Sequence, residues 1–185
     1  MSESLYTGNY LNLIKDGNWE YVKRTTGKDV VYILPALRFQ VGYEHSMNNN
    51  IRIVMTSEFR APFGKNVLSF PAGLVGDVNK NEALIAAAYR ELLEETGYKA
   101  NRIRYLASGP SSSGLSDETI HYYLADVLEK VSDGGGDDTE NITVYCWFLN
   151  NVEGNIKKNL NDGMIVDSKV YAGLYWLNKF SDQIE

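Results

Sequence analysis

Cysteine is almost missing from this chain of 185 residues, and its scarcity excludes two classes of protein. The single cysteine, Cys146, cannot form an internal disulfide framework or a zinc site built on paired cysteines. The chain also lacks a dense run of lysine and arginine, and its net charge is −6. A protein of this charge is not expected to bind nucleic acid or an anionic membrane as its main partner.

Long apolar runs are missing as well. No stretch approaches the roughly 20 apolar residues that span a bilayer, and the N-terminal sequence has no basic segment followed by an apolar one, which a secretory signal requires. We therefore expect a soluble, cytoplasmic protein with no membrane partner. A chain of this length should form one domain and bury about 70% of the surface that its unfolded form exposes.

Two parts of unequal size are predicted from the composition along the chain. Residues 1–28 are polar with aromatic residues spaced through them, which indicates an N-terminal arm or hairpin, and residues 29–185 form the main domain. Within the first strand of that domain, Pro35 predicts a sheet edge or a bulge, and residues 45–50 have the composition of a turn. Runs rich in β-branched and aromatic residues predict strands at 29–39, 51–60, 67–70, 102–108, 119–130 and 141–149.

Two helices are predicted, one in the middle of the main domain and one at its end. Residues 81–97 are rich in alanine, leucine and glutamate and end at Gly97, the residue type that often follows a last helical turn. Residues 168–180 are apolar at helical spacing, with Asp167 or Ser168 as the N-cap. Strands, a helix, more strands and a terminal helix together predict a mixed α/β (α+β) fold.

Three carboxylates lie close together on the predicted helix. Glu91, Glu94 and Glu95 fall on one face, because a helix has 3.6 residues per turn. Like charges at this spacing destabilise a helix unless water or a cation surrounds them. Carboxylate oxygens suit Mg²⁺ or Mn²⁺, so this face is a candidate metal site, and Arg90 can orient it through an i,i+4 pair with Glu94. The alternative is an ordinary surface helix with salt bridges.

The wider pattern around this helix resembles the box of the Nudix hydrolases. It runs from Gly76 through Glu82 and Arg90 to Tyr98, and every fixed position of the box matches. The resemblance implies a Nudix-type α/β/α sandwich around a mixed β-sheet, and hydrolysis of a nucleoside diphosphate linked to another moiety. One departure concerns Gly73, which corresponds to the glycine that opens the box in the nearest subfamilies. Eight residues separate it from Glu82, so either Gly73 or Gly76 can take the structural role.

Further segments, in chain order, resemble the ADP-sugar pyrophosphatases, a subfamily that includes ADP-ribose hydrolases. They are Trp19–Thr26, Glu58–Pro62, Phe70–Gly73, Gly114–His121, Gly134–Ile142 and Val166–Tyr171. The resemblance implies hydrolysis of ADP-ribose to AMP and ribose 5-phosphate with Mg²⁺, for which Mn²⁺ can substitute. Another nucleotide sugar, such as GDP-mannose, and a nucleotide-sensing domain without catalysis stay open as alternatives. Since the subfamily generally forms homodimers with exchanged N-terminal segments, a homodimer is expected.

The same resemblance implies substrate contacts outside the helix. Trp19 and Tyr10 would stack on the nucleobase, while Arg24 and Arg60 would pair with the phosphates, which a guanidinium fork fits. Packing within the arm is the alternative role for the aromatic residues, and rim salt bridges are the alternative for the arginines. Three further substrate contacts are implied at Gly114, Leu115 and Ser116.

Metal ligands are implied as well. The carbonyl of Ala72 and the side chains of Glu91 and Glu95 would bind metal directly. Glu94 would bind a further metal ion or contact the ligands from outside.

Glu140 is the remaining candidate, because it ends a glycine-rich loop at 132–140. The resemblance implies that Glu140 activates or orients the attacking water, and a metal-ligand role is also open for it. The loop can close over a substrate, or it can be a solvated linker after which Glu140 merely begins a strand. The predicted catalytic residues are therefore Glu140, Glu94 and Arg90.

Overall fold

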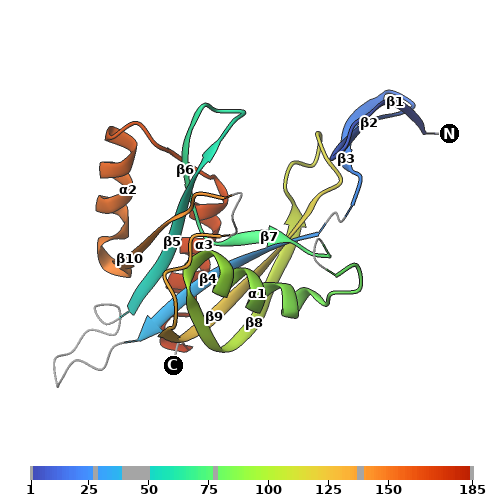
Figure 1. The fold of residues 1–185 in the computed structure, drawn as a ribbon. Coiled ribbons are helices and arrows are strands. Elements are labelled where there is room, and N and C mark those ends of the chain that lie inside the picture. The colour runs from blue at the N-terminus through green and yellow to red at the C-terminus, as the bar shows by residue number, and fades with distance from the viewer. Residues whose placement is uncertain (1, 27–28, 39–50, 77–78, 137–139, 184–185) are drawn as a thin grey trace, which may run out of the picture.

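The computed structural model describes residues 2–26, 29–38, 51–76, 79–136 and 140–183 (Figure 1). The strands are β1 (Glu3–Thr7), β2 (Leu11–Asp16), β3 (Trp19–Arg24), β4 (Asp29–Arg38), β5 (Ile51–Arg60), β6 (Lys65–Ser69), β7 (Ala72–Leu74), β8 (Tyr98–Pro110), β9 (Thr119–Lys130), β10 (Thr143–Phe148) and β11 (Ile165–Val166). The helices are α1 (Leu84–Thr96), α2 (Val152–Asn161) and α3 (Lys169–Lys179), with short 3-10 turns η2 (Leu149–Asn151) and η3 (Ser181–Gln183). The predicted turn at 45–50 lies outside the described residues.

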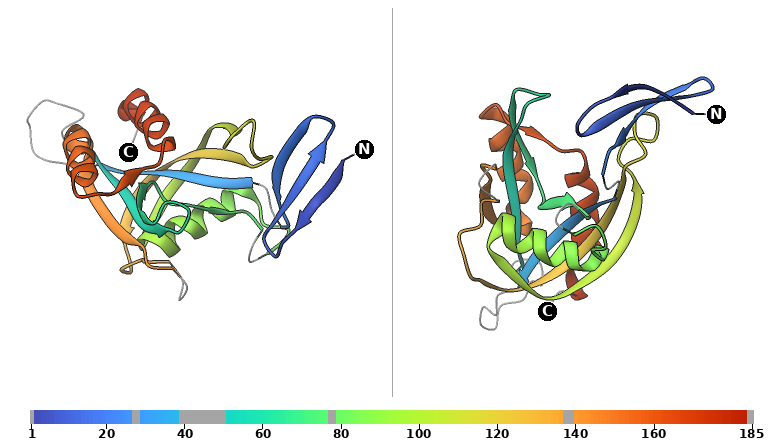
Figure 2. Two further views of the ribbon diagram at one scale, coloured as in Figure 1. Left: turned by 90° about the horizontal axis from the view of Figure 1, so that it is seen from above. Right: turned by 45° about the vertical axis from the view of Figure 1, so that its right-hand side comes forward.

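An eight-stranded mixed sheet forms the centre of the molecule. Its main path runs β11-β6-β5-β4-β9-β8, with β7 paired to β4 and β10 paired to β5. The pairs β4–β9 and β11–β6 are parallel, and the other pairs are antiparallel. Helix α1 covers one face of the sheet and α3 covers the other (Figure 2). This confirms the predicted mixed α/β class and the sandwich around a mixed sheet.

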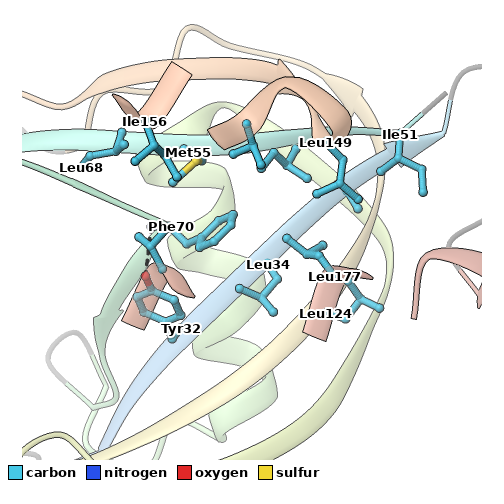
Figure 3. Packing of buried hydrophobic residues seen from close by; sticks show 14 of the residues in the cluster. Tyr32, Leu34, Ile51, Met55, Leu68, Phe70, Leu124, Leu149, Ile156 and Leu177 are labelled. Atoms are coloured by element: carbon cyan, nitrogen blue, oxygen red, sulfur yellow. Dashed lines mark hydrogen bonds between the residues drawn. The ribbon is translucent and has the colours of Figure 1, made fainter. Parts of the chain in front are cut away.

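Strand β4 explains how both faces of the sheet come to be buried. Side chains alternate along a strand, so its even and odd positions pack on different faces. Tyr32 and Leu34 belong to a large apolar cluster that also contains residues of α2 and α3 (Figure 3). Val31 and Ile33 pack with Ala87, Ala88 and Leu92 of α1. A strand covered on both faces needs an almost continuous apolar run, which is what the sequence has here.

The prediction of an edge or bulge at Pro35 is wrong, because β4 is a central strand. Along one edge of β4, Pro35 is paired in parallel register with β9. The N–H of Ile33 points away from β9 and donates to the carbonyl of Pro71. Alternate residues face the same side, so the N–H that Pro35 lacks would point there too. That position falls between the pairing of β4 with β7 and its pairing with β5, where the sheet loses no ladder bond.

Helix α2 is missing from the prediction, which expected one helix before the last strands and one after them. Its sequence, VEGNIKKNLN, is polar and contains a glycine, so its composition resembles a loop. Only Val152 and Ile156, four residues apart, are buried against the large cluster. Two apolar side chains hold this helix on the sheet, and such a sparse pattern carries little helical signal. The predicted helices at 81–97 and 168–180 are confirmed, although each is shorter by a few residues at its start or end.

The first strands form a separate three-stranded antiparallel sheet, β1-β2-β3. Figures 1 and 2 show it projecting from one end of the main sheet. Its link to the main sheet is through β3, where the N–H of Val22 donates to the carbonyl of Leu115 at 2.8 Å. Within the residues that the structure describes, no helix has both the length and the apolar character needed to cross a bilayer.

Candidate active site

A cavity of about 690 Å³ opens between α1 and the strands β4 to β7. It brings together residues that lie far apart in the sequence. The carboxylates on its wall are Glu58, Glu91, Glu94, Glu95, Glu118, Glu140 and Asp167, and the cations are Arg24, Arg60, Arg90 and Lys169. A cavity of this size matches those that hold small molecules, and its wall is unusually rich in charge.

Helix α1 places two of these carboxylates deep in the wall. The apolar side of the helix packs on the sheet, and the helix ends at Gly97, whose φ of 73° is the left-handed conformation expected of a glycine in this position. Glu91 and Glu95 are each only 7% exposed, whereas half of the Glu94 side chain is exposed. Buried carboxylates are rare in proteins unless they are paired or bind metal.

Arg90 connects the loop before the helix to the carboxylates. Its Nε and Nη2 donate to the two carboxylate oxygens of Glu82, at 2.8 and 3.0 Å. Its Nη1 donates to Oε1 of Glu91 at 2.8 Å and to Oε2 of Glu94 at 2.9 Å. A further bond from Nη2 reaches the carbonyl of Leu74. The i,i+4 pair predicted between Arg90 and Glu94 is therefore present, and the same guanidinium group also fixes Glu91.

Glu95 lies among negative charges. Burial raises the pKa of its carboxyl well above the usual range, and the neighbouring Glu91 and Glu140 carboxylates raise it further. The N–H of Ala72 donates to its Oε1 at 3.1 Å, and that bond together with Arg60 acts in the opposite direction on the pKa. Desolvation outweighs them, so the site as built favours either a proton or a cation at Glu95.

The two candidate box glycines have different roles in the structure. A Cβ atom added to Gly73 would lie 1.9 Å from the carboxyl carbon of Glu91, so the absence of a side chain there makes room for that carboxylate. Gly76 instead has a φ of 85°, which favours glycine, and its N–H donates to Glu82. The two glycines therefore have separate functions. Gly73 allows close packing against Glu91, and Gly76 forms the turn that holds Glu82.

The glycine-rich loop docks on the C-terminal end of α1. The N–H of Gly135 donates to the carbonyl of Glu95 at 2.8 Å, and that of Gly136 donates to the carbonyl of Glu94 at 3.1 Å. These bonds satisfy carbonyl groups that a helix end leaves unpaired. The alternative of a plain solvated linker is therefore excluded for residues 134–136, while 137–139 lie outside the described residues. The docked loop places Glu140 in the cavity wall, close enough to Glu95 to raise its pKa.

The carboxylates have the chemistry of a site for a hard divalent cation, because each supplies oxygen ligands. In the parts of the chain that the structure describes, no three Asp, Glu, His or Cys side chains are yet grouped closely enough to hold a metal ion. Arg90 donates to oxygens of Glu91 and Glu94, and the N–H of Ala72 donates to Glu95. The crowding of negative charge around Glu95 nevertheless fits a cation, which would relieve it.

Both predicted phosphate-binding arginines lie in the cavity wall, and both are paired. Arg24 donates from Nε to Glu118 at 2.7 Å, which ties β3 of the arm to the start of β9. Arg60 is 2.8 Å from Glu58 on the same strand. The side chain of Arg60 is more than half exposed, and its charge acts on Glu95 across the cavity. Each arginine can therefore donate further N–H groups to an anion.

The structure does not bring the predicted stacking residues to the large cavity. Trp19 is 64% exposed and Tyr10 is 81% exposed, both on the N-terminal sheet. Trp19 instead lines a smaller pocket of about 280 Å³ together with Gly114 and Ser116, and Leu115 accepts the hydrogen bond from β3. In a single chain, the segment 114–116 therefore supports the arm.

Sequence reasoning missed the residues that reach the cavity from β11 and α3. Asp167 and Lys169 belong to the Val166–Tyr171 segment of the resemblance, and Asp167 is a candidate helix cap, but the sequence assigns neither of them to the site. In the structure, both line the cavity beside Tyr32 and Ser69. A lysine two residues after a capping aspartate gives no local signal of a site. The parallel pairing of β11 with β6 carries these residues there, and this contact joins segments about one hundred positions apart.

Comparison with known proteins agrees with this arrangement. A sequence model of the NUDIX domain matches residues 46–168. The methanol dehydrogenase activator of Bacillus methanolicus is 33% identical over 133 residues, which are 71% of this chain and 68% of that protein. The ADP-sugar pyrophosphatase of Mus musculus is 34% identical over 132 residues, or 69% of this chain and 53% of the mouse protein. The ADP-ribose pyrophosphatase of Mycobacterium tuberculosis is 32% identical over 130 residues, or 70% of this chain and 59% of that protein. The match therefore spans little more than half the length of the last two relatives.

Proposed function

This chain belongs to the Nudix family, and we propose that it hydrolyses the diphosphate of a nucleoside diphosphate sugar, with ADP-ribose as its substrate. The products would be AMP and ribose 5-phosphate. The names of the mouse and mycobacterial relatives support this substrate class. The single cysteine is compatible with the cytoplasm, where thiols stay reduced, and we place the enzyme there.

One observation carries the proposal, namely the charge on the wall of the large cavity. Carboxylates of α1 and the guanidinium groups of Arg24 and Arg60 line the same space. A diphosphate is an anion with several oxygens, and guanidinium forks bind such oxygens through paired N–H donors. Carboxylates cannot bind it directly, so their presence beside the arginines calls for a cation between them and the phosphates.

Glu91, Glu95 and the carbonyl of Ala72 would hold that cation, with Glu94 as a further ligand or an outer contact. Mg²⁺ is the ion that we propose, with Mn²⁺ as a substitute, since both prefer oxygen ligands. When bound, the ion neutralises the charge that develops on the phosphate oxygens. Arg90 would hold Glu91 and Glu94 in position through its Nη1 group.

Glu140 is the proposed general base. It would accept a proton from a water molecule, whose oxygen attacks one phosphorus atom while the bond from that phosphorus to the bridging oxygen breaks. Two phosphate monoesters result, one on the nucleoside and one on the sugar. Support comes from the docked loop, which presents Glu140 to the cavity next to the α1 carboxylates.

A second copy of the chain would complete the site. We propose a homodimer in which the N-terminal sheet of one protomer presents Trp19 and Tyr10 to the nucleobase in the cavity of the other. The exposure of both aromatic side chains supports this arrangement, because neither of them lines the large cavity of its own chain. The Trp19→Ala variant should raise KM by about 5- to 150-fold, the equivalent of about 1–3 kcal/mol of stacking, with a smaller change in kcat. A protein that sediments as a strict monomer at micromolar concentration would contradict the shared site.

The decisive experiment incubates the protein with Mg²⁺ and a panel of nucleoside diphosphate sugars and identifies the products. Glu91→Gln and Glu95→Gln should each lower kcat by about two to three orders of magnitude, as loss of a principal electrostatic group does. Glu153→Gln is the matched control, since Glu153 lies on an exposed position of α2 and does not line the cavity. Normal turnover in both cavity variants would refute the proposed metal face.

The same panel separates the two alternatives. Faster hydrolysis of GDP-mannose than of ADP-ribose would change the substrate and keep the reaction. Binding of nucleotides without any hydrolysis would instead indicate a sensing domain, although the intact set of glutamates argues against it.

A further inference from the structure

A charged pair that α1 does not supply also lines the large cavity. Asp167 directly follows β11, and Lys169 is the first residue of α3. The Nζ atom of Lys169 lies 2.6 Å from Oδ2 of Asp167, and their side chains are 28% and 20% exposed. Helices α1 and α3 cover opposite faces of the sheet (Figure 2). The pair at the start of α3 therefore enters the cavity wall independently of the α1 carboxylates.

The hydroxyl group of Tyr32 lies beside this pair. Its oxygen accepts hydrogen bonds from Oγ of Ser69 and from the N–H of Phe70, the second of which is drawn in Figure 3. Burial and the charge of Asp167 raise the pKa of Tyr32, so the hydroxyl stays protonated. The Tyr32 side chain is fully buried, and these two bonds fix its hydroxyl group at the cavity wall.

The available groups fit a neutral hydroxylated ligand better than an anion. Lys169 has three N–H donors, and its bond to Asp167 uses one of them. Asp167 offers acceptor oxygens. A hydroxyl group both donates and accepts, so it can use both residues, whereas a phosphate only accepts and cannot donate to the Asp167 carboxylate.

We infer that Lys169 and Asp167 bind the hydroxyl groups of the substrate's sugar. This inference rests on the proposed function, because it assumes that the diphosphate lies between the α1 carboxylates and the arginines. The sugar is then the part of the substrate that meets the pair at the β11 edge of the cavity. These residues make the protein prefer a nucleoside diphosphate that carries a sugar over one that does not.

Calorimetry without turnover tests the inference. ADP-ribose and ADP are titrated into the protein in EDTA, which prevents metal-dependent hydrolysis, and the two dissociation constants are compared. The Lys169→Met variant keeps the aliphatic part of the side chain over the Tyr32 ring, from whose centre Nζ is 5.7 Å away. It should weaken the binding of ADP-ribose by about 10- to 100-fold, the usual effect of losing hydrogen bonds from a charged group. The binding of ADP should change less than about threefold, since ADP has no second sugar.

Lys179→Met is the matched control. Lys179 lies in the last turn of the same helix and also stands over aromatic rings, with Nζ 5.3 Å from the centre of the Trp176 ring, but it does not line the cavity. It should leave both dissociation constants unchanged. Lys169→Gln provides a second test if the methionine variant melts at a lower temperature than the control.

The outcomes separate this inference from the proposed function. An equal loss of affinity for ADP-ribose and ADP, or no loss for either, overturns the inference. So does a wild-type protein that binds ADP-ribose no more tightly than ADP. A wild-type protein that binds ADP-ribose through Lys169 but hydrolyses no member of the substrate panel overturns the proposed function and leaves the inference standing.

Discussion

Replacing Gly73 by alanine tests the most closely packed contact of the site. The added Cβ would lie 1.9 Å from the carboxyl carbon of Glu91 and 2.0 and 2.3 Å from its two oxygens. Since non-bonded carbon atoms pack at about 3.5–4.0 Å, the carboxyl group must retreat by about 1.5 Å. Gly73 does not have a positive φ, so alanine fits its backbone, and the group that moves is the flexible end of a side chain.

The expected result is therefore a loss of activity with little loss of stability. A misplacement of about 1 Å in a catalytic site can cost about 100-fold in rate, so Gly73→Ala should lower kcat at least that much. Its melting temperature should stay close to that of the wild type. The rate is measured as AMP release at saturating Mg²⁺, and the melting temperature is measured by scanning calorimetry.

Gly76→Ala is the matched control, and it should show the opposite behaviour. Its φ of 85° disfavours alanine by about 1–2 kcal/mol, which for a chain of this length lowers the melting temperature by about 2–8 °C. The nearest atom to its new Cβ would be 3.7 Å away, an ordinary contact, so kcat should stay within a few-fold of the wild type. If Gly73→Ala keeps normal turnover, or if Gly76→Ala loses more activity than it does, the assigned roles of the two glycines are wrong.

Three further predictions concern Glu140, its loop and Glu82. Glu140→Gln should lower kcat by about 10²–10⁴-fold with little change in KM, as expected for a general base, and a kcat within a few-fold of the wild type would exclude that role. Gly136→Ala would place a Cβ 2.2 Å from Oε2 of Glu140. Gly135 also has a positive φ, but the Cβ of Gly135→Ala would have no atom closer than 3.9 Å, so only Gly136→Ala should lower kcat by tenfold or more. Hydrogen bonds from Arg90 lower the pKa of Glu82 in the folded protein. Ionised Glu82 therefore stabilises the fold at pH values above its unfolded-state pKa, and this stabilisation is lost as the pH falls through the lowered folded-state pKa. Glu82→Gln should therefore cost about 1.5–3 kcal/mol at pH 7 and should flatten the acid side of a plot of unfolding free energy against pH.

The local sequence is sufficient to predict the box helix and most of the strands. Strands β5 and β9 have the predicted bounds, because their alternating β-branched and aromatic residues end at charged or turn residues. The carboxylate face of α1 followed from helical spacing alone. These features depend on residues within about one or two helical turns of each other, and such short-range patterns are what a single sequence records best.

Features that depend on tertiary contacts could not be predicted in this way. The central position of Pro35 is tolerated because β4 changes its partner there from β7 to β5. The residues near Pro35 in the sequence do not indicate that change. The pairing of Arg24 with Glu118 joins positions 94 residues apart, so an arginine predicted to bind phosphate also anchors the arm. Lys169 reaches the cavity only because β11 pairs with β6.

The loop before Glu140 shows why residue types alone leave a site underdetermined. Three consecutive glycines predict a linker and a lid equally well, because both need a flexible backbone. In the structure, all three have a positive φ, and two of their N–H groups donate to the last carbonyls of α1. The glycines are thus required for a fixed conformation. Since α1 also carries Glu91 and Glu95, the backbone bonds that cap this helix also set the distance from its carboxylates to Glu140, a relation that no side chain in the loop encodes.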